Sequence, residues 1–132
     1  MFEKYNFIIK MTNNIINCKL VVLGALGVGK TSVISNILDK KFNSDSFPTM
    51  TANCETKIVN INDRVIKVSL WDTSGEENFH SITKMFYRIS DIVILIYDIT
   101  NKKSFDEIQN YWIEEVNENI ENLKGKYIKI II

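Results

Sequence analysis

Short apolar runs along this chain of 132 residues predict the strands of a sheet. Runs this continuous are typical of strands that are buried on both faces. The strands predicted in this way are Cys18–Leu23, Ile92–Ile96 and Tyr127–Ile132. Two further runs, 56–61 and 65–71, are separated only by Asn62-Asp63, a pair typical of a tight hairpin turn.

Apolar residues at helical spacing lie between these runs. One such pattern predicts a helix from Lys30 to near Phe42, and the polar stretch that ends at Pro48 is predicted to be a loop. A capping box, Ser104 with Glu107, is predicted to open a second helix that Gly125 ends. The apolar stripe of this second helix is Phe105, Ile108, Trp112, Val116, Ile120 and Leu123.

Strands that alternate with helices predict an α/β fold. We expect a mainly parallel sheet with helices on both faces and one antiparallel hairpin. The length suits one domain, predicted to span residues 18–132. Residues 1–17 are predicted to be a flexible extension, unless their apolar part, Tyr5–Ile9, packs on the domain.

Composition narrows the class of protein. Sixteen basic residues balance sixteen acidic ones, so charge gives no case for nucleic acid as a partner. Two cysteines, Cys18 and Cys54, are too few for a disulfide framework and indicate reduced, partly buried thiols in a cytoplasmic protein. No apolar run has the roughly 20 residues of a membrane span, and the N-terminus lacks the pattern of a signal peptide.

A phosphate-binding motif follows the first predicted strand. The pattern G-x-x-x-x-G-K-[ST] is matched at every fixed position, between a buried strand and a helix. Its residues are Gly24, Ala25, Leu26, Gly27, Val28, Gly29, Lys30 and Thr31, and Ser32 follows them. Backbone N–H groups of such a loop surround phosphate oxygens, the lysine reaches the outer phosphates, and the threonine hydroxyl binds Mg²⁺.

A second tetrad, Asp72-Thr73-Ser74-Gly75, ends the hairpin. An acid in this place can hold Mg²⁺ through water, and the Gly75 N–H can meet the terminal phosphate. Such a tetrad is a common turn when it stands alone, and it gains meaning beside the phosphate loop.

These motifs resemble those of the Ras superfamily and, within it, the Rab branch. Trp71–Glu77 is similar to the W-D-T-A-G-Q-E of these GTPases, and Lys67–Trp71 to the Rab run K-L-Q-I-W. Further similar segments are Phe79–Thr83, Phe86–Arg88, Tyr97–Thr100, Ser104-Phe105 and Trp112. The resemblance implies a P-loop small-G-protein fold, GTP or GDP with Mg²⁺ as ligands, and a switch in vesicle traffic.

The resemblance also implies roles for further residues. Thr49, in the first switch, would complete the Mg²⁺ shell with Thr31 and Asp72, and Gly75 would act in catalysis with Lys30. Phe42 either packs on the guanine ring or is a core residue at a helix end.

Protein effectors and regulators would bind Phe47–Thr49, Trp71 and Phe86. Cys54 stands where the family has the third aromatic of this surface, and Met50–Cys54 is a poor copy of the Rab signature I-G-V-D-F.

Two substitutions bear on catalysis. Glu76 replaces the family's catalytic glutamine, and a carboxylate there accepts hydrogen bonds only and repels the phosphate. Leu26 occupies a loop position that is small or polar in relatives, where it either crowds the phosphate or turns outward. We expect slow hydrolysis, although Glu76 could also be a harmless substitution of similar size.

The guanine-reading motifs N-K-x-D and S-A-K do not occur in these residues, nor does a C-terminal cysteine for prenylation. On this basis the sequence supplies phosphate and Mg²⁺ binding but does not decide guanine specificity, and it gives no basis for membrane attachment beyond transient contact. The alternative is a non-catalytic interaction module that binds nucleotide weakly or not at all. The sole histidine, His80, is predicted to be a solvent-exposed residue of the second switch, and Met85 and Phe86 to be core or interface residues.

Overall fold

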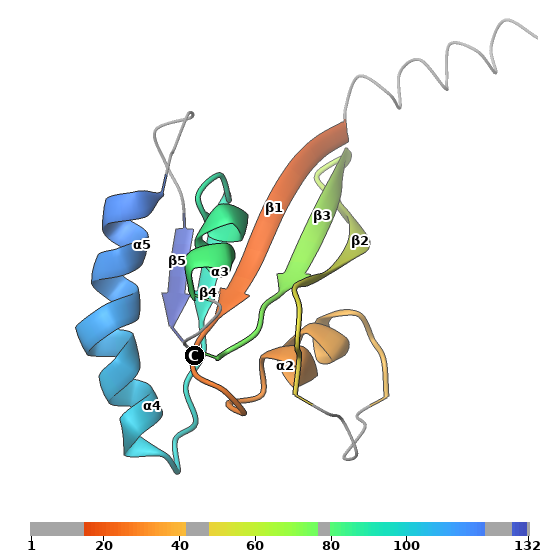
Figure 1. Ribbon diagram of the computed structural model, residues 1–132. Coiled ribbons are helices and arrows are strands. Elements are labelled where there is room, and N and C mark those ends of the chain that lie inside the picture. The colour runs from red at the N-terminus through yellow and green to blue at the C-terminus, as the bar shows by residue number, and fades with distance from the viewer. Residues whose placement is uncertain (1–14, 42–47, 77–79, 121–127, 132) are drawn as a thin grey trace, which may run out of the picture.

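The computed structural model describes residues 15–41, 48–76, 80–120 and 128–131. A five-stranded sheet with the order β2-β3-β1-β4-β5 runs through these residues (Figure 1). The strands are β1 (Ile15–Leu23), β2 (Asn53–Ile61), β3 (Arg64–Asp72), β4 (Ile92–Leu95) and β5 (Ile128–Ile131). Neighbouring strands are parallel except β2 and β3, which form an antiparallel hairpin. The predicted mixed sheet is therefore confirmed.

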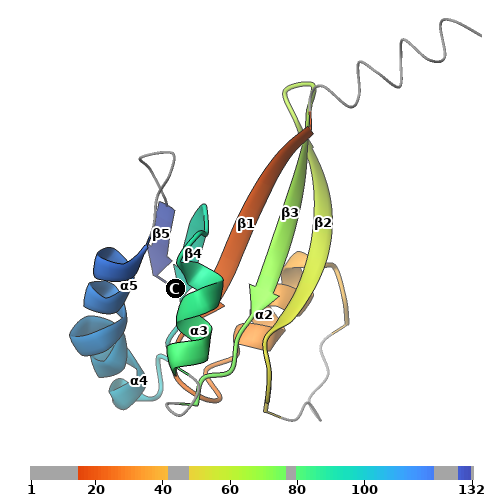
Figure 2. The same cartoon turned by 45° about the horizontal axis from the view of Figure 1, so that its top comes forward.

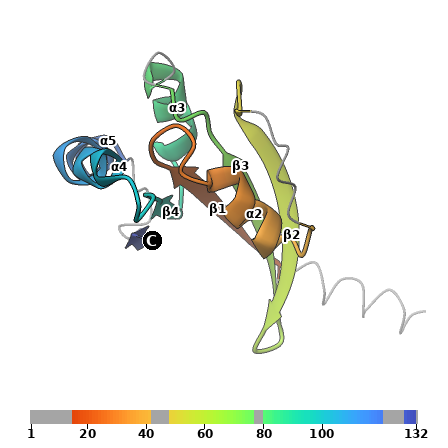
Figure 3. The ribbon, with the colours of Figure 1, turned by 90° about the horizontal axis from the view of Figure 1, so that it is seen from below.

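Helices cover both faces of this sheet. They are α2 (Lys30–Ile37), α3 (His80–Tyr87), α4 (Lys102–Glu107), the π-helical turn η2 (Ile108–Trp112) and α5 (Ile113–Asn119). Because α4, η2 and α5 follow one another without a break, they form a single long helix. In Figure 2, α3 lies in front of the sheet and α2 behind it. The view from below separates α2 from α3 and from the α4–α5 helix (Figure 3).

The core has two parts because successive residues of a strand point to opposite faces. In β1, Val21 and Leu23 pack with Trp112 on one face of the sheet, whereas Leu20 and Val22 pack with α2 on the other. Val21, Val22 and Leu23 are fully buried, and burial of each such side chain contributes about 1.5–3 kcal/mol. The predicted burial of this strand on both faces is thus confirmed.

The hairpin turn sets the register of β2 against β3. Asn62 and Asp63 have φ angles of 47° and 61°, as a type I′ turn requires, and Ile61 pairs with Arg64. From this register, Cys54 lies directly opposite Trp71.

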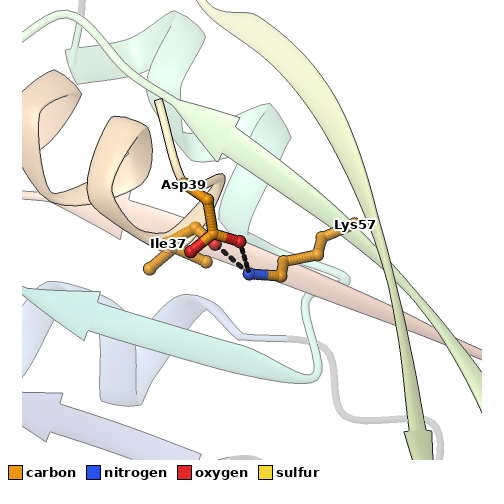
Figure 4. A network of polar contacts seen from close by, with 3 residues as sticks. All are labelled: Ile37, Asp39 and Lys57. Carbon is orange, nitrogen blue, oxygen red and sulfur yellow. Dashed lines mark hydrogen bonds and ion pairs between the residues drawn. The ribbon is translucent and has the colours of Figure 1, made fainter. Parts of the chain in front are cut away.

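The first helix ends earlier than predicted, at Ile37 and not near Phe42. Asp39 has the left-handed φ of 58° that stops helical geometry. The Lys57 ammonium from β2 donates to the Ile37 carbonyl and, at 2.9 Å, to the Asp39 carboxylate (Figure 4). Lys40 likewise pairs with Glu55. The end of α2 is therefore fastened to β2 by two ion pairs.

The second predicted helix begins and ends elsewhere than expected. Asn101 caps it by accepting from the Lys103 N–H at 3.2 Å, so the predicted capping box of Ser104 and Glu107 is wrong. Ser104 is instead buried and accepts from the Asp98 N–H at 3.0 Å. The helix ends at Asn119 and not at Gly125, which lies outside the described residues.

The apolar stripe of this helix explains the π-helical turn. Ile108, Trp112 and Val116 follow one another at intervals of four residues and are fully buried. In a helix of 3.6 residues per turn, repeated intervals of four drift around the axis. The wider turn at Ile108–Trp112 corrects this drift and keeps the stripe on the sheet.

The first strand also differs from the prediction, because β1 starts at Ile15 and pairs with β3 from that residue. The predicted boundary between extension and domain, Asn17, therefore lies within a strand.

Candidate functional site

The predicted phosphate loop joins the end of β1 to the start of α2. Its first residue, Gly24, has a φ of 144°, and a Cβ there would lie 2.1 Å from the Ile96 carbonyl oxygen. Only glycine fits this contact. Because the first turn of a helix leaves N–H groups without partners, a loop that enters α2 offers several donors to one anion.

Lys30 is buried at the start of α2. Its ammonium donates to the Gly24 carbonyl at 2.9 Å and to the Ala25 carbonyl at 2.7 Å. Burial lowers the pKa of Lys30 to about 8, and the charges of Asp72 and Glu107 oppose this shift. Burial removes water that would stabilise the charged ammonium, and an anion at the loop would stabilise that charge instead. The site is therefore electrostatically suited to phosphate.

Three oxygen-bearing side chains meet beside the loop. The Thr31 hydroxyl donates to the Asp72 carboxylate at 2.6 Å and lies 3.0 Å from the Thr49 hydroxyl. The Thr49 hydroxyl is 3.5 Å from the same carboxylate oxygen. Thr31, Thr49 and Asp72 were the three residues predicted to surround a metal ion, and the structure brings them together.

Asp72 has the properties of a ligand to a cation. Its Oδ1 atom is buried and has no hydrogen-bond partner, a costly arrangement that a cation would relieve. Burial raises the pKa of Asp72, whereas the hydrogen bond from Thr31 and the charge of Lys30 lower it. Mg²⁺ prefers hard oxygen donors and commonly combines one carboxylate with phosphate oxygens and water. The residues present fit Mg²⁺ on these terms.

Among the described residues, no three or more His, Cys, Asp and Glu side chains gather at one place. A protein-only metal cage is therefore not present in this part of the chain. The donor set around Asp72 suits a cation that arrives with phosphate oxygens of its own.

The segment after β3 presses against the loop. The Thr73 hydroxyl donates to the Val22 carbonyl at 2.7 Å and so fixes this segment to β1. A Cβ at Gly75 would lie 2.5 Å from three atoms, namely Ala25 C, Leu26 N and Lys30 Nζ. Gly75 thus brings a backbone N–H close to the loop at a point where no side chain fits.

A cavity of about 220 Å³ opens between these elements. It is lined by Leu26, Gly27, Gly29, Lys30, Thr31, Ser32, Pro48, Thr49, Thr73 and Gly75. Leu26 lines it with half of its surface exposed. Glu76 is next to this lining without belonging to it, and its N–H donates to the Ser74 hydroxyl at 3.3 Å. Phe42 and Phe47 lie outside the described residues.

Two residues of the predicted partner surface, Trp71 and Phe86, lie side by side. The rings of Trp71 and Phe86 lie 4.9 Å apart at 32°, and Cys54 is exposed on the strand opposite Trp71. The prediction that this thiol is partly buried was wrong.

Sequence reasoning missed Lys19, whose ammonium lies 4.9 Å from the centre of the Trp71 ring. A charged residue within the apolar run of β1 was the available signal.

Next to Phe86, an apolar cavity of about 180 Å³ is bordered by Met50, Ala52 and Ile82.

The prediction for His80 was wrong. Its ring is stacked on Tyr111 at 4.9 Å and 17°, and meets the edge of Trp112 at 4.8 Å. His80 is partly buried, and its Nε2 atom is buried without a hydrogen-bond partner. Aromatic residues of the long helix cover this side chain, and nothing in the local sequence around His80 signals that contact.

No helix in the described part of the chain combines the length and the apolar character that a membrane crossing needs.

The sheet order, the loop at the start of α2 and the oxygens around Asp72 define a P-loop nucleotide-binding domain. Comparison with known proteins narrows this class, since residues 19–132 match the Ras family. Over 97 residues the chain is 41% identical to the Ypt/Rab-type GTPase ypt7 of Schizosaccharomyces pombe. It is 43% identical to a Ras-related protein Rab7 of Glycine max and 42% identical to RABG3d of Arabidopsis thaliana over the same length.

Each of these alignments covers 74% of the chain and 47% of the relative. The chain therefore spans about half the length of the curated relatives it matches. It belongs to the Ras family, as a Rab-type small GTPase.

Proposed function

We propose that this chain binds GTP and GDP with Mg²⁺ and acts as a Rab-type switch in intracellular vesicle traffic. The observation that carries the proposal is the meeting of Thr31, Thr49 and Asp72 beside the buried Lys30. One hydroxyl comes from α2, one from the segment before β2, and the carboxylate from β3. Their convergence at the mouth of a phosphate loop supports a nucleotide–Mg²⁺ site.

In this proposal each residue has a defined task. Lys30 and the N–H groups from Gly24 to Ser32 hold the phosphates, and the hydroxyl of Thr31 and the carboxylate of Asp72 hold the metal side. When bound, Mg²⁺ neutralises charge that develops on the phosphates. Thr49 and the Gly75 N–H would sense the terminal phosphate, so its loss would release both segments.

Hydrolysis would consist of in-line attack by water on the γ-phosphate, and we propose that it is slow. Glu76 sits one residue beyond Gly75, where a carboxylate adds negative charge near the phosphates. Leu26 lines the cavity, which favours crowding of the phosphate over an outward turn. Slow turnover would give a long-lived bound state.

The proposed partners are protein effectors and regulators that contact Phe47–Thr49, Trp71 and Phe86, with the exposed Cys54 in the place of an aromatic. The proposed location is the cytoplasm, with transient association with endomembranes. The relatives named Ypt/Rab-type GTPase and Rab7 support the Rab-type class from which these proposals follow.

Titration of the purified chain with GTP and with ATP, each with and without Mg²⁺, tests the proposal. We expect Mg²⁺-dependent binding of GTP that ATP does not match. Equal binding of both nucleotides would indicate a P-loop protein without guanine preference. No binding of either at millimolar concentration would leave the non-catalytic interaction module as the better description.

The slow step has a separate test. Glu76→Gln should raise the single-turnover rate of phosphate release about tenfold, which corresponds to roughly 1.4 kcal/mol of barrier. Leu26→Ser should act in the same direction. Unchanged rates in both variants, with nucleotide bound, would remove these two residues from the explanation.

A further inference from the structure

His80 is the first residue of α3, and only residues 77–79 separate it from Glu76 at the end of the phosphate-site segment. Its ring lies in a cradle made by two consecutive residues of the long helix, Tyr111 and Trp112. These two rings are themselves in edge contact at 4.9 Å and 73°. The Nε2 atom of His80 is buried and makes no hydrogen bond, so the contacts that the structure shows for this side chain are those with the two rings.

The cradle depends on the π-helical turn. Tyr111 and Trp112 are the last two residues of η2, where the helix is wider than an α-helix. Such turns are rare and occur frequently at functional sites. Here the turn lets Trp112 enter the core, 1% exposed, while the neighbouring Tyr111 faces the imidazole.

Trp112 of this turn is also linked to Lys30 of the phosphate loop, through the charge of Glu107. The indole N–H of Trp112 donates to the Glu107 carboxylate at 2.8 Å. The charge of Glu107 is felt at Lys30, where it opposes the larger effect of burial on the pKa of that lysine. Glu107 is therefore hydrogen-bonded to Trp112 of the cradle and acts on Lys30 through its charge alone.

We propose that His80 is a positioning residue that couples the phosphate site to the long helix. By docking in the Tyr111–Trp112 cradle, it holds the start of α3, and with it the segment Asp72–Glu76, in one place relative to η2. A change of bound nucleotide would move that segment and so alter the surroundings of Trp112. This inference rests on the proposed function, since it needs two nucleotide states.

Charged groups near the cradle come from both packed elements. Glu107 and Glu115 belong to the long helix, and Lys84 lies on α3 itself. Glu115 is occupied, because it accepts from the Tyr87 hydroxyl at 2.7 Å and lies 3.6 Å from Lys84. Glu107 accepts from the Trp112 indole, so both carboxylates have partners other than the imidazole.

Tryptophan fluorescence gives a direct test, because the chain has only two tryptophans. In a Trp71→Phe background, Trp112 is the sole reporter. Its emission is measured with GDP–Mg²⁺ and with a non-hydrolysable GTP analogue and Mg²⁺. We expect different emission in the two states, and His80→Ala should reduce this difference to less than a fifth. Tyr111→Ala, which removes the opposite wall, should reduce it as well.

Two further variants separate positioning from a general structural role. His80→Phe retains an aromatic ring and should keep most of the nucleotide-dependent difference. Met85→Ala lies on the same helix at a residue that is 73% exposed, and should leave the difference unchanged.

The coupling is overturned if Trp112 emits equally in both nucleotide states, or if His80→Ala retains the full difference. Failure of the chain to bind nucleotide would overturn the proposed function and the coupling together. A separate nucleotide titration distinguishes the two cases, because equal emission of Trp112 with both nucleotides bound overturns the coupling alone.

Discussion

The Thr31 hydroxyl donates a 2.6 Å hydrogen bond to the Asp72 carboxylate, and this bond joins the start of α2 to the end of β3. The other oxygen of that carboxylate is buried and unpaired. The hydrogen bond from Thr31 therefore satisfies one carboxylate oxygen of Asp72, and the other oxygen remains available as an acceptor for a cation. This geometry fixes where a cation would have to lie, between the phosphate loop and the hairpin.

Asp72→Asn tests the metal side of the site. The change keeps the shape of the side chain and removes the negative charge that faces the cation. Nucleotide affinity with Mg²⁺ should fall by about 10–100-fold, the range found when outer-shell partners of a metal are lost. Affinity measured in EDTA should change little.

Asp63→Asn is a matched control for this variant, because Asp63 lies exposed in the hairpin turn and asparagine tolerates its φ of 61°. Equal loss of affinity in both variants, or an Asp72→Asn loss that persists in EDTA, would contradict a metal role for Asp72.

Lys30 should make the nucleotide-free chain more stable at alkaline pH. Its pKa is lowered to about 8 in the folded chain, mainly by burial, from 10.5 in the unfolded chain. Between these values the unfolded chain binds more protons, so the free energy of unfolding rises with pH there. The destabilisation caused by burying the charged Lys30 is fully present below about pH 8. It is relieved as pH increases to 10.5, which raises the free energy of unfolding by up to about 3 kcal/mol.

Urea unfolding at pH 7.5 and pH 10 measures this effect, and Lys30→Met supplies the comparison. The rise in stability should be smaller in Lys30→Met than in the parent chain. A parallel rise in both proteins would mean that other groups cause it.

Gly75→Ala should disturb the contact between the two phosphate-sensing segments. The new Cβ would lie 2.5 Å from two backbone atoms of the loop and from the Lys30 ammonium, so the Asp72–Gly75 segment must withdraw. Overpacking of this kind costs about 1–3 kcal/mol of stability. Binding of a non-hydrolysable GTP analogue should weaken more than binding of GDP, because only the triphosphate needs the Gly75 N–H.

Calorimetric titration of the Gly75→Ala chain with each nucleotide checks this expectation. If both affinities fall by the same factor, Gly75 has a structural role and does not sense the terminal phosphate.

The ion pair between Lys57 and Asp39 should contribute little by its charge. Asp39 is largely exposed, and exposed pairs are worth about 0.2–1 kcal/mol. Lys57→Met should nevertheless cost more than Asp39→Asn, because it also leaves the Ile37 carbonyl at the end of α2 without its donor. A double-mutant cycle by urea unfolding measures the coupling. Coupling well above 1 kcal/mol, unchanged in 1 M salt, would contradict this view.

The sequence by itself determined the strands, the two helices that begin near Lys30 and near Ser104, and the phosphate loop. The continuous apolar run Leu20–Leu23, the Asn62-Asp63 turn and the motif ending in Thr31 are local patterns. Each one follows from backbone geometry over a few residues. The oxygens of Thr49 and Asp72 were also placed correctly beside Thr31, through a resemblance between motifs.

Only the tertiary structure decided the contacts between distant elements. It ended α2 at Ile37 through Lys57 of β2, and it placed Lys19 over Trp71. It also packed the partly buried His80 against Tyr111 and Trp112, where the sequence had predicted an exposed residue. These outcomes depend on how helices pack across a sheet, and a single π-helical turn changed which side chains meet. Local sequence carries the propensity of a residue, whereas packing selects its partner.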